Sequence, residues 1–307
     1  MRHRLTWIAV LLWAALLWAA PVWSQITLDA EALRPPLGTS YTLELTSMTG
    51  ALVDNGIDVG PGGADRAYDL SGTLSGETGL EMTVSAIPLS EAPDAGQFPE
   101  ADYALRSHLD MPDGTTQTAY SYLQLGEGGD VTLGTTVDSE GASTTVESSL
   151  LPLPLHYGQS WSTPQLAVET ELSPGVSMFG TIDVESEIDA WGVVTVPAGE
   201  YPYLRIHQVS MGQMAYQGDP SLEALGPVTS TAESYAWNTR HLGGVASIAQ
   251  TTTAFSDGAM PPTTLTQIVR LIHAEGPPSA VAATSWGALK LLQHVQLRGL
   301  YPERTTD

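Results

Sequence analysis

The sequence predicts an all-β fold: a strongly curved antiparallel sheet, or half-barrel, between residues 25 and 275. Short runs in which apolar and polar residues alternate recur along the chain, and a period of two is typical of a strand with one buried face. The 30 glycines and 21 prolines are spread among these runs, as turn residues are. Residues 25–150 contain no sustained apolar period of 3.6, so the sequence predicts no clear helix there.

The first 24 residues predict an export signal, expected as an N-terminal signal helix. A basic start at Arg2, His3 and Arg4 precedes an apolar run at residues 5–17 and a cleavage point near Ser24. The alternative is an uncleaved anchor, because the apolar run with its flanks is almost long enough to span a bilayer. We expect cleavage, which leaves an extracytoplasmic protein, periplasmic or secreted, without a stable membrane anchor.

Residues 25–150 contain short strand candidates separated by turn clusters. The clearest is 41–47, in which Tyr41, Leu43 and Leu45 fall on one face. The other candidates are residues 80–86, 103–109, 118–124 and 131–137. Their spacing predicts an antiparallel sheet that is laid down as a meander.

The most regular pattern lies in residues 181–211, which we expect to form the central ribbon of the sheet. Its first strand has a solvated face and a buried face, because four acids alternate with four less polar residues. The acids are Asp183, Glu185, Glu187 and Asp189, and the buried face carries Ile182, Val184, Ser186 and Ile188. A short link, a strand at 193–196, a turn at 197–199 and a strand at 203–209 follow.

Three more strand candidates complete the sheet. They are residues 231–237, 245–250 and 264–272, the last of which we expect to close the sheet. Residues 211–226 are less regular and predict a loop or one short helix.

Short motifs in this half carry a resemblance to a known family. They are Val194-Thr-Val-Pro-Ala-Gly-Glu-Tyr201 with Leu204-Arg205-Ile206, Leu151-Pro-Leu-Pro-Leu155 with Gly158-Gln-Ser-Trp161, and Tyr235-Ala-Trp237 with Gly243-Gly244-Val245. Over residues 150–274 the chain resembles the TapB-like secreted bacterial domains, which are similar in architecture to the LolA/LolB lipoprotein-carrier half-barrel. The function of TapB-like domains is largely unknown, so the resemblance implies a fold more than an activity.

The chain is strongly acidic, with 34 acids, 11 bases and a formal net charge of -23. Such a surface repels phosphate backbones, so we expect no nucleic-acid partner. The acidity can serve solubility or, alternatively, a surface for divalent cations. The absence of cysteine excludes disulfides, thiol catalysis and a lipid-anchored cysteine.

No motif in the sequence predicts catalysis, so we expect a protein that is not an enzyme and has no cofactor. It contains no Gly-x-Ser-x-Gly, His-Glu-x-x-His, Walker or dinucleotide pattern, and its seven histidines are scattered. One acidic loop, with Asp54, Asp58, Asp65 and Asp69, leaves two interpretations open. It is either an ordinary solvated turn or a calcium site that lacks the final glutamate of an EF-hand.

Four aromatic residues of the second half are the candidate ligand-binding residues. Trp161, Trp191, Tyr235 and Trp237 can form the walls of an apolar cavity between the sheet and its cover, as in lipid carriers. The alternative is that these side chains are ordinary core residues.

Residues 276–307 predict a linker and a C-terminal helical tail. Gly276-Pro277-Pro278 is typical of a linker, and Trp286 and Leu289 begin an apolar stripe at helical spacing. The tail also holds Lys290, Arg298 and Arg304. It is either a helix docked on the sheet, a frayed end, or a basic element that docks the protein elsewhere.

Two functions follow from these patterns. The first is an exported, non-enzymatic envelope or secreted protein that binds an apolar ligand, such as a lipid, or a partner's apolar segment in the concave face of the sheet. The second is a structural or protein-interaction module that docks through its C-terminal tail. An enzyme built from the scattered histidines and acids ranks last.

Overall fold

The computed structural model describes residues 26–275, with gaps at residues 75–76, 112–113, 127–128, 138–142, 145–150, 174, 225 and 257–260. The predicted signal (1–24) and the predicted linker and C-terminal helix (276–307) lie outside the described residues. In the part of the chain that is described, no helix combines the length and the apolar character that crossing a membrane requires.

The fold is all-β, as predicted, and in the described residues thirteen strands form one sheet. The first strands are β1 (Ser40–Thr49), β2 (Gly63–Asp69), β3 (Glu77–Ile87), β4 (Tyr103–Asp110), β5 (Thr116–Gly126), β6 (Gly129–Val137) and β7 (Ser143–Thr144). The later strands are β8 (Ser160–Ser173), β9 (Val176–Val196), β10 (Gly199–Gln217), β11 (Val228–Thr239), β12 (Gly243–Phe255) and β13 (Thr263–Glu275). The described helical elements are short: α2 (Ala30–Leu33), η1 (Leu89–Glu91), η2 (Ala95–Gln97) and α3 (Pro220–Glu223).

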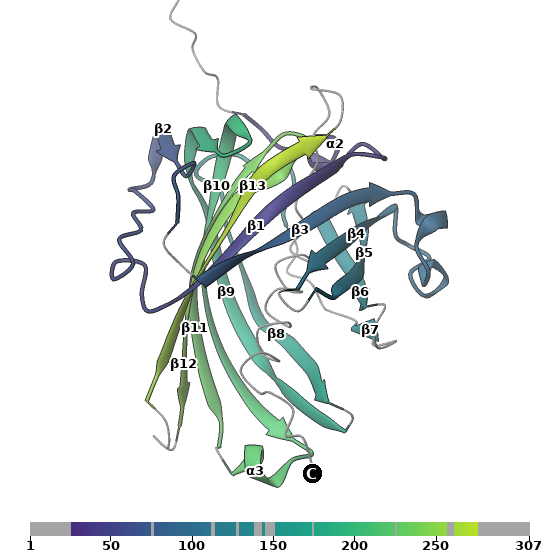
Figure 1. Cartoon of the computed structure of the whole chain (residues 1–307), viewed down its shortest axis with the longest axis vertical. Coiled ribbons are helices and arrows are strands. Elements are labelled where there is room, and N and C mark those ends of the chain that lie inside the picture. Colours follow the sequence, from purple (N-terminus) through teal and green to yellow (C-terminus); the bar gives the residue numbers. More distant parts are fainter. Residues whose placement is uncertain are drawn as a thin grey trace, which may run out of the picture.

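The sheet consists of two antiparallel meanders joined through β1, which confirms the predicted meander. In β3 to β7 and again in β8 to β13, each strand pairs with the next one along the chain. The last strand, β13, pairs with β1, and β1 pairs on its other side with β3. Figure 1 shows the resulting twisted sheet, in which β9 to β12 run along the length of the molecule while β1 and β3 cross it diagonally.

The predicted central ribbon is correct in its strands but wrong in its continuity and place. β9 runs unbroken from Val176 to Val196, so the predicted link between residues 189 and 193 is wrong. β10 extends to Gln217, into the segment for which the sequence predicted a loop or one short helix, and α3 supplies a short helix within the described part of residues 211–226. The ribbon lies next to an edge, because the outer side of β9 pairs only with β8 and β2.

A β-bulge allows β9 to be one long strand. Ala190 pairs with Arg205 and Ile188 pairs with Ile206, which leaves Asp189 as an extra residue on β9. The extra residue turns the strand over. Before the bulge, even-numbered side chains such as Ile188 point to one face of the sheet. After the bulge, even-numbered side chains such as Ala190 point to the other face.

The two faces of this sheet are covered by different segments of the chain. We call the face that carries Arg205 and Arg270 the arginine face, and residues 50–74, which include β2, the strap. The strap hydrogen-bonds to the arginine face near the β9–β10 turn, at the top of Figure 1. The opposite face packs against residues 28–33 and Leu155.

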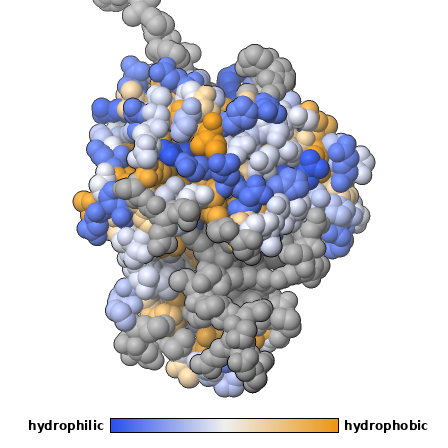
Figure 2. All heavy atoms as spheres, in the orientation of Figure 1, coloured by the Kyte–Doolittle hydropathy of each residue, from blue (hydrophilic) through white to orange (hydrophobic). Residues whose placement is uncertain are grey.

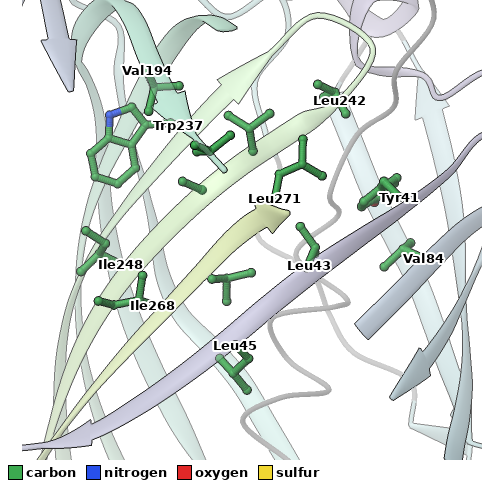
Figure 3. Packing of buried hydrophobic residues seen from close by; sticks show 14 of the residues in the cluster. Tyr41, Leu43, Leu45, Val84, Val194, Trp237, Leu242, Ile248, Ile268 and Leu271 are labelled. Carbon is green, nitrogen blue, oxygen red and sulfur yellow. The ribbon is translucent and has the colours of Figure 1, made fainter. Parts of the chain in front are cut away.

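The largest core cluster joins side chains of both meanders. Figure 3 shows Trp237, Ile248 and Ile268 at one end of this cluster and Tyr41 and Val84 at the other. Leu43 and Leu45 are buried with Tyr41, as the alternation in residues 41–47 predicted. A smaller cluster packs η1 and η2 against β4 and β5, where Phe98 stacks on Tyr122 with ring centroids 4.3 Å apart.

Edge strand β8 is interrupted near its middle. Its register with β9 shifts between Thr163 and Leu166, and Gln165 adopts a left-handed backbone with φ of 52°. The Gln165 amide donates to Oδ1 of Asp183 at 2.8 Å instead of continuing the ladder.

Candidate functional site

One row of side chains crosses the arginine face from β10 to β1. Each member pairs directly with the next across neighbouring strands, so all of them point to the same side of the sheet. The members are Arg205, Trp237, Ala246, Arg270 and Glu44. Asp189, the bulged residue of β9, stands beyond Arg205, so each end of the row is an arginine paired with a carboxylate.

Arg205 is fully buried, and all its polar contacts are made with the sheet and the strap. Its Nε and Nη2 donate to the two carboxylate oxygens of Asp189 at 2.8 and 2.7 Å. Its Nη1 donates to the carbonyl oxygens of Val59 and Gly60. Burial lowers the pKa of Arg205, but the hydrogen bonds and charge of Asp189 outweigh it and leave the pKa above its ordinary value.

Arg270 repeats this arrangement at the other end of the row. Its Nη2 donates to Glu44, and its Nη1 donates to the carbonyl oxygens of Leu70, at 2.9 Å, and Gly72. The two arginines therefore bind the main chain of the strap at two places. An unpaired buried charge would be costly, and these contacts use donors that would otherwise be unsatisfied.

Tyr68 of the strap fills the space above Arg205 and Trp237. Its ring is 5.5 Å from the Trp237 ring and 5.7 Å from the Tyr203 ring, both edge-on. The Arg205 guanidinium carbon lies 4.9 Å from the Tyr68 centroid and 5.0 Å from that of Tyr235, within cation–π range. Burial is the main cause that raises the pKa of Tyr68 and of Tyr203.

The four predicted ligand-binding aromatics do not come together. Tyr235 and Trp237 lie on the arginine face, where they pair with His207 and Arg205. Trp237 is 0% exposed beneath the strap. Trp161 and Trp191 lie on the opposite face, half-buried against the cluster that contains Leu28 and Leu155. The four residues therefore lie as two pairs on opposite faces, and ligand binding by either pair stays a prediction.

The part of the arginine face that lies below the strap is here called the acidic face. It comprises Asp183, Glu185 and Glu187 of β9, His207, Val209 and Met211 of β10, and Glu233 of β11. The three β9 acids are exposed, as predicted, whereas Asp189 beyond them is half-buried against Arg205. Val209 and Met211 are 45% and 60% exposed, although β10 has a neighbour on each side.

A small polar cluster joins the acidic face to the row. The His207 and Tyr235 rings stack with centroids 4.6 Å apart and an interplanar angle of 5°. One oxygen of Glu233 accepts from the Tyr235 hydroxyl at 2.6 Å and lies 3.0 Å from Nε2 of His207. The Tyr235 hydroxyl is the main cause that holds the pKa of Glu233 below its ordinary value.

Two aspartates of the acidic loop accept hydrogen bonds from residues two positions further along the loop. Oδ1 of Asp58 accepts from the amide of Gly60 at 2.7 Å, and Oδ1 of Asp69 accepts from the amide and hydroxyl of Ser71. Among the described residues, no three His, Cys, Asp or Glu side chains are grouped as a metal site requires. These contacts are those of an ordinary polar turn.

The sequence analysis missed the arginine row. Arg205 stands between Leu204 and Ile206, and Arg270 stands between Val269 and Leu271. A single charge in an apolar strand is a usable signal, because such a residue must find a partner where the strand is buried on both faces. Which partner it finds depends on strand order, and that cannot be read from local spacing.

Comparisons with known proteins leave the family open. No family model matches the chain, and no curated protein sequence matches it. Among solved structures it is similar to the crystal structure of a putative lipoprotein from Parabacteroides distasonis, with 12% identity and a TM-score of 0.33, over 80% of this chain and 99% of that one. A similarity this low carries no inference about function, and the resemblance to TapB-like domains stays a prediction.

Proposed function

We propose that this protein is a non-enzymatic interaction module that binds a polypeptide partner on its acidic face. The observation that carries the proposal is the exposure of Val209 and Met211 in the interior of a sheet. Isolated exposed apolar residues are common on surfaces, but here two neighbours on one face of one strand are framed by acids. Apolar contact area surrounded by polar residues is typical of a binding surface.

The charges select the chemistry of the partner. Between residues 26 and 275 the chain has six arginines and no lysine against 32 acids. No lysine or arginine occurs among the residues of the acidic face, and two of the six arginines are buried in the row. A partner with alternating basic and apolar side chains would match both features. Electrostatic attraction would mainly speed its association, and apolar contact would hold it.

The apolar-ligand function has less support. The candidate residues Tyr235 and Trp237 already pack against the chain's own Arg205, and Tyr68 also packs against Trp237. Trp161 and Trp191 remain as half-buried candidates on the opposite face. We therefore keep an apolar ligand, such as a lipid, as the second function, and place it on that face.

A designed peptide tests the proposed function. The probe is a labelled strand-forming peptide in which lysine alternates with valine, titrated with the full-length protein by fluorescence anisotropy. We expect binding that weakens as salt screens the charges, and about a tenfold loss for the double variant Val209→Ser with Met211→Ser.

Matched controls separate binding at this site from nonspecific binding. Val53→Ser removes an apolar side chain that is 80% exposed on the strap and should leave the affinity unchanged. A glutamate–valine peptide should not bind, and a lysine–serine peptide should bind more weakly. Equal affinity for wild type and for the Val209 and Met211 double variant would disprove the proposal.

A further inference from the structure

Strand β2 of the strap is attached to the sheet differently from every other described strand. It pairs in parallel with β9, whereas the remaining pairs of the described sheet are antiparallel. Of its seven residues only Tyr68 is buried, and the others are exposed or partly exposed. Main-chain pairing with one anchoring side chain is the mode in which sheet edges bind extended peptides.

The hydrogen bonds from the groups beneath the strap go to its main chain rather than to its side chains. Arg205 donates to the carbonyl oxygens of Val59 and Gly60, and Arg270 donates to those of Leu70 and Gly72. The Tyr203 hydroxyl donates to the carbonyl oxygen of Arg66 at 3.3 Å. Carbonyl oxygens are present in every polypeptide, so these donors would bind another extended chain in the same position.

The edge of β9 is shaped for this close approach. Gly192 has a φ of 152°, and a Cβ atom there would lie 1.9 Å from the carbonyl oxygen of Arg66. A side chain at residue 192 would therefore block a strand at this edge without entering the core. The pocket for the anchor is built from the rings of Tyr203 and Trp237 and from the Arg205 guanidinium.

Glycines lie on both sides of β2 within the strap. Gly60 and Gly62 precede β2, Gly63 is its first residue, and Gly72 follows it. Gly60 and Gly63 have positive φ, so the chain turns sharply on to β9 and is held there mainly by the contacts above. Such a segment can open locally, because within residues 60–72 only Tyr68 is buried and Leu70 is partly buried against the core.

We propose that the groove under the strap is a binding site for an extended polypeptide with an aromatic side chain, and that residues 59–72 are its resident, exchangeable occupant. The incoming strand adds in parallel to residues 190–195 of β9 and places its ring in the Tyr68 pocket. This inference goes beyond the acidic face and is independent of it, because it depends on different residues.

The test uses a fluorescein-labelled peptide with the sequence of residues 57–74, added to the full-length protein. In the variant Tyr68→Ala the resident strap loses its anchor. We therefore expect the peptide to bind this variant at least about tenfold more tightly than it binds wild type. The same peptide with its tyrosine changed to alanine should bind neither protein.

Two chain variants act as controls for the site. Adding Gly192→Ala to Tyr68→Ala should abolish peptide binding, because both strands need the same approach to β9. Tyr157→Ala, which removes a tyrosine that is 36% exposed elsewhere, should bind the peptide no better than wild type does. If the folded Tyr68→Ala protein gains no affinity for the peptide, the proposal is wrong.

A second measurement covers the case in which Tyr68→Ala does not fold. Native-state hydrogen exchange on wild type compares the amides of residues 66–70 with those of residues 204–208 in β10. We expect the strap amides to exchange through a local opening at least about tenfold faster. Exchange of both sets at one common rate, set by global unfolding, would show that the strap is a permanent part of the core.

Discussion

Arg205 and Arg270 stand in one cross-strand row, separated by Trp237 and Ala246, and both donate to carbonyl oxygens of the strap. Each also pairs with a carboxylate from a neighbouring strand, Asp189 or Glu44. The two ion pairs thus have a double role, since each arginine is neutralised within the sheet and also donates through Nη1 to the covering segment. The stability of the sheet and the position of the strap should therefore change together.

Removing the charge of Asp189 should destabilise the protein strongly. Asp189→Asn leaves the guanidinium of Arg205, whose side chain is 1% exposed, without its counter-charge. Loss of one partner of a buried pair costs about 3–5 kcal/mol of unfolding free energy. Urea unfolding followed by circular dichroism measures this, with Glu185→Gln on the exposed face as the control. A change below about 1 kcal/mol would mean that solvent reaches Arg205.

The substitution Gly192→Ala should detach β2 from the edge of β9. The new Cβ would overlap the Arg66 carbonyl, and residue 192 would be held at a positive φ. We expect a loss of about 1–3 kcal/mol from this strain. The matched control is Gly96→Ala in η2, where a Cβ meets no atom within 4 Å. Near-ultraviolet circular dichroism should change only for the residue 192 variant, because Tyr68 leaves its pocket.

Alkaline pH should destabilise the fold through its buried tyrosines. Burial raises the pKa of Tyr68, Tyr201, Tyr203 and Tyr235 above the ordinary value of about 10. A group with a raised pKa in the folded state contributes stability that is fully present below its unfolded pKa and is lost as the pH rises through the folded one. Titration of absorbance at 295 nm should show fewer than the chain's 11 tyrosines ionising near pH 10 before unfolding.

The substitution Tyr235→Phe should raise the pKa of Glu233. The Tyr235 hydroxyl is the largest cause of the lowered pKa of Glu233, and phenylalanine keeps the ring stacked on His207. A carboxyl group whose pKa is lower in the folded state stabilises the fold at a pH above its unfolded-state pKa. This stabilisation is lost as the pH falls through the folded-state pKa. Carbon-detected NMR titration of the glutamate carboxylates measures the shift. An unchanged titration midpoint for Glu233 would show that the Tyr235 hydroxyl is not needed to lower its pKa.

Much of the strand content could be predicted from the sequence because the period of two is a local property. The alternation in 182–188 and in 41–47 places each side chain on its observed face. The bulge at Asp189 could not be predicted in the same way. It inserts one residue without changing local composition, and its effect appears only when Arg205 and Ala190 are paired across strands.

The candidate site was less predictable than the fold. Trp161, Trp191, Tyr235 and Trp237 were selected for their chemistry, yet strand order sends one pair to each face. Neither the arginine row nor the acidic face with its exposed Met211 follows from sequence spacing, since both need side chains from strands that are distant in the chain. The strap appeared in the sequence only as an acidic loop, because the groups through which it accepts from Arg205, Arg270 and Tyr203 are main-chain oxygens.

The interruption of β8 has a consequence for how the protein behaves at high concentration. A regular outer strand offers a row of free amides and carbonyls on which a second molecule can extend the sheet, which is how fibrils grow. In β8, Pro164 has no amide hydrogen to offer, and the left-handed turn at Gln165 breaks the straight line that an added strand would need. The interruption therefore disfavours extension of the sheet by a second molecule at this edge.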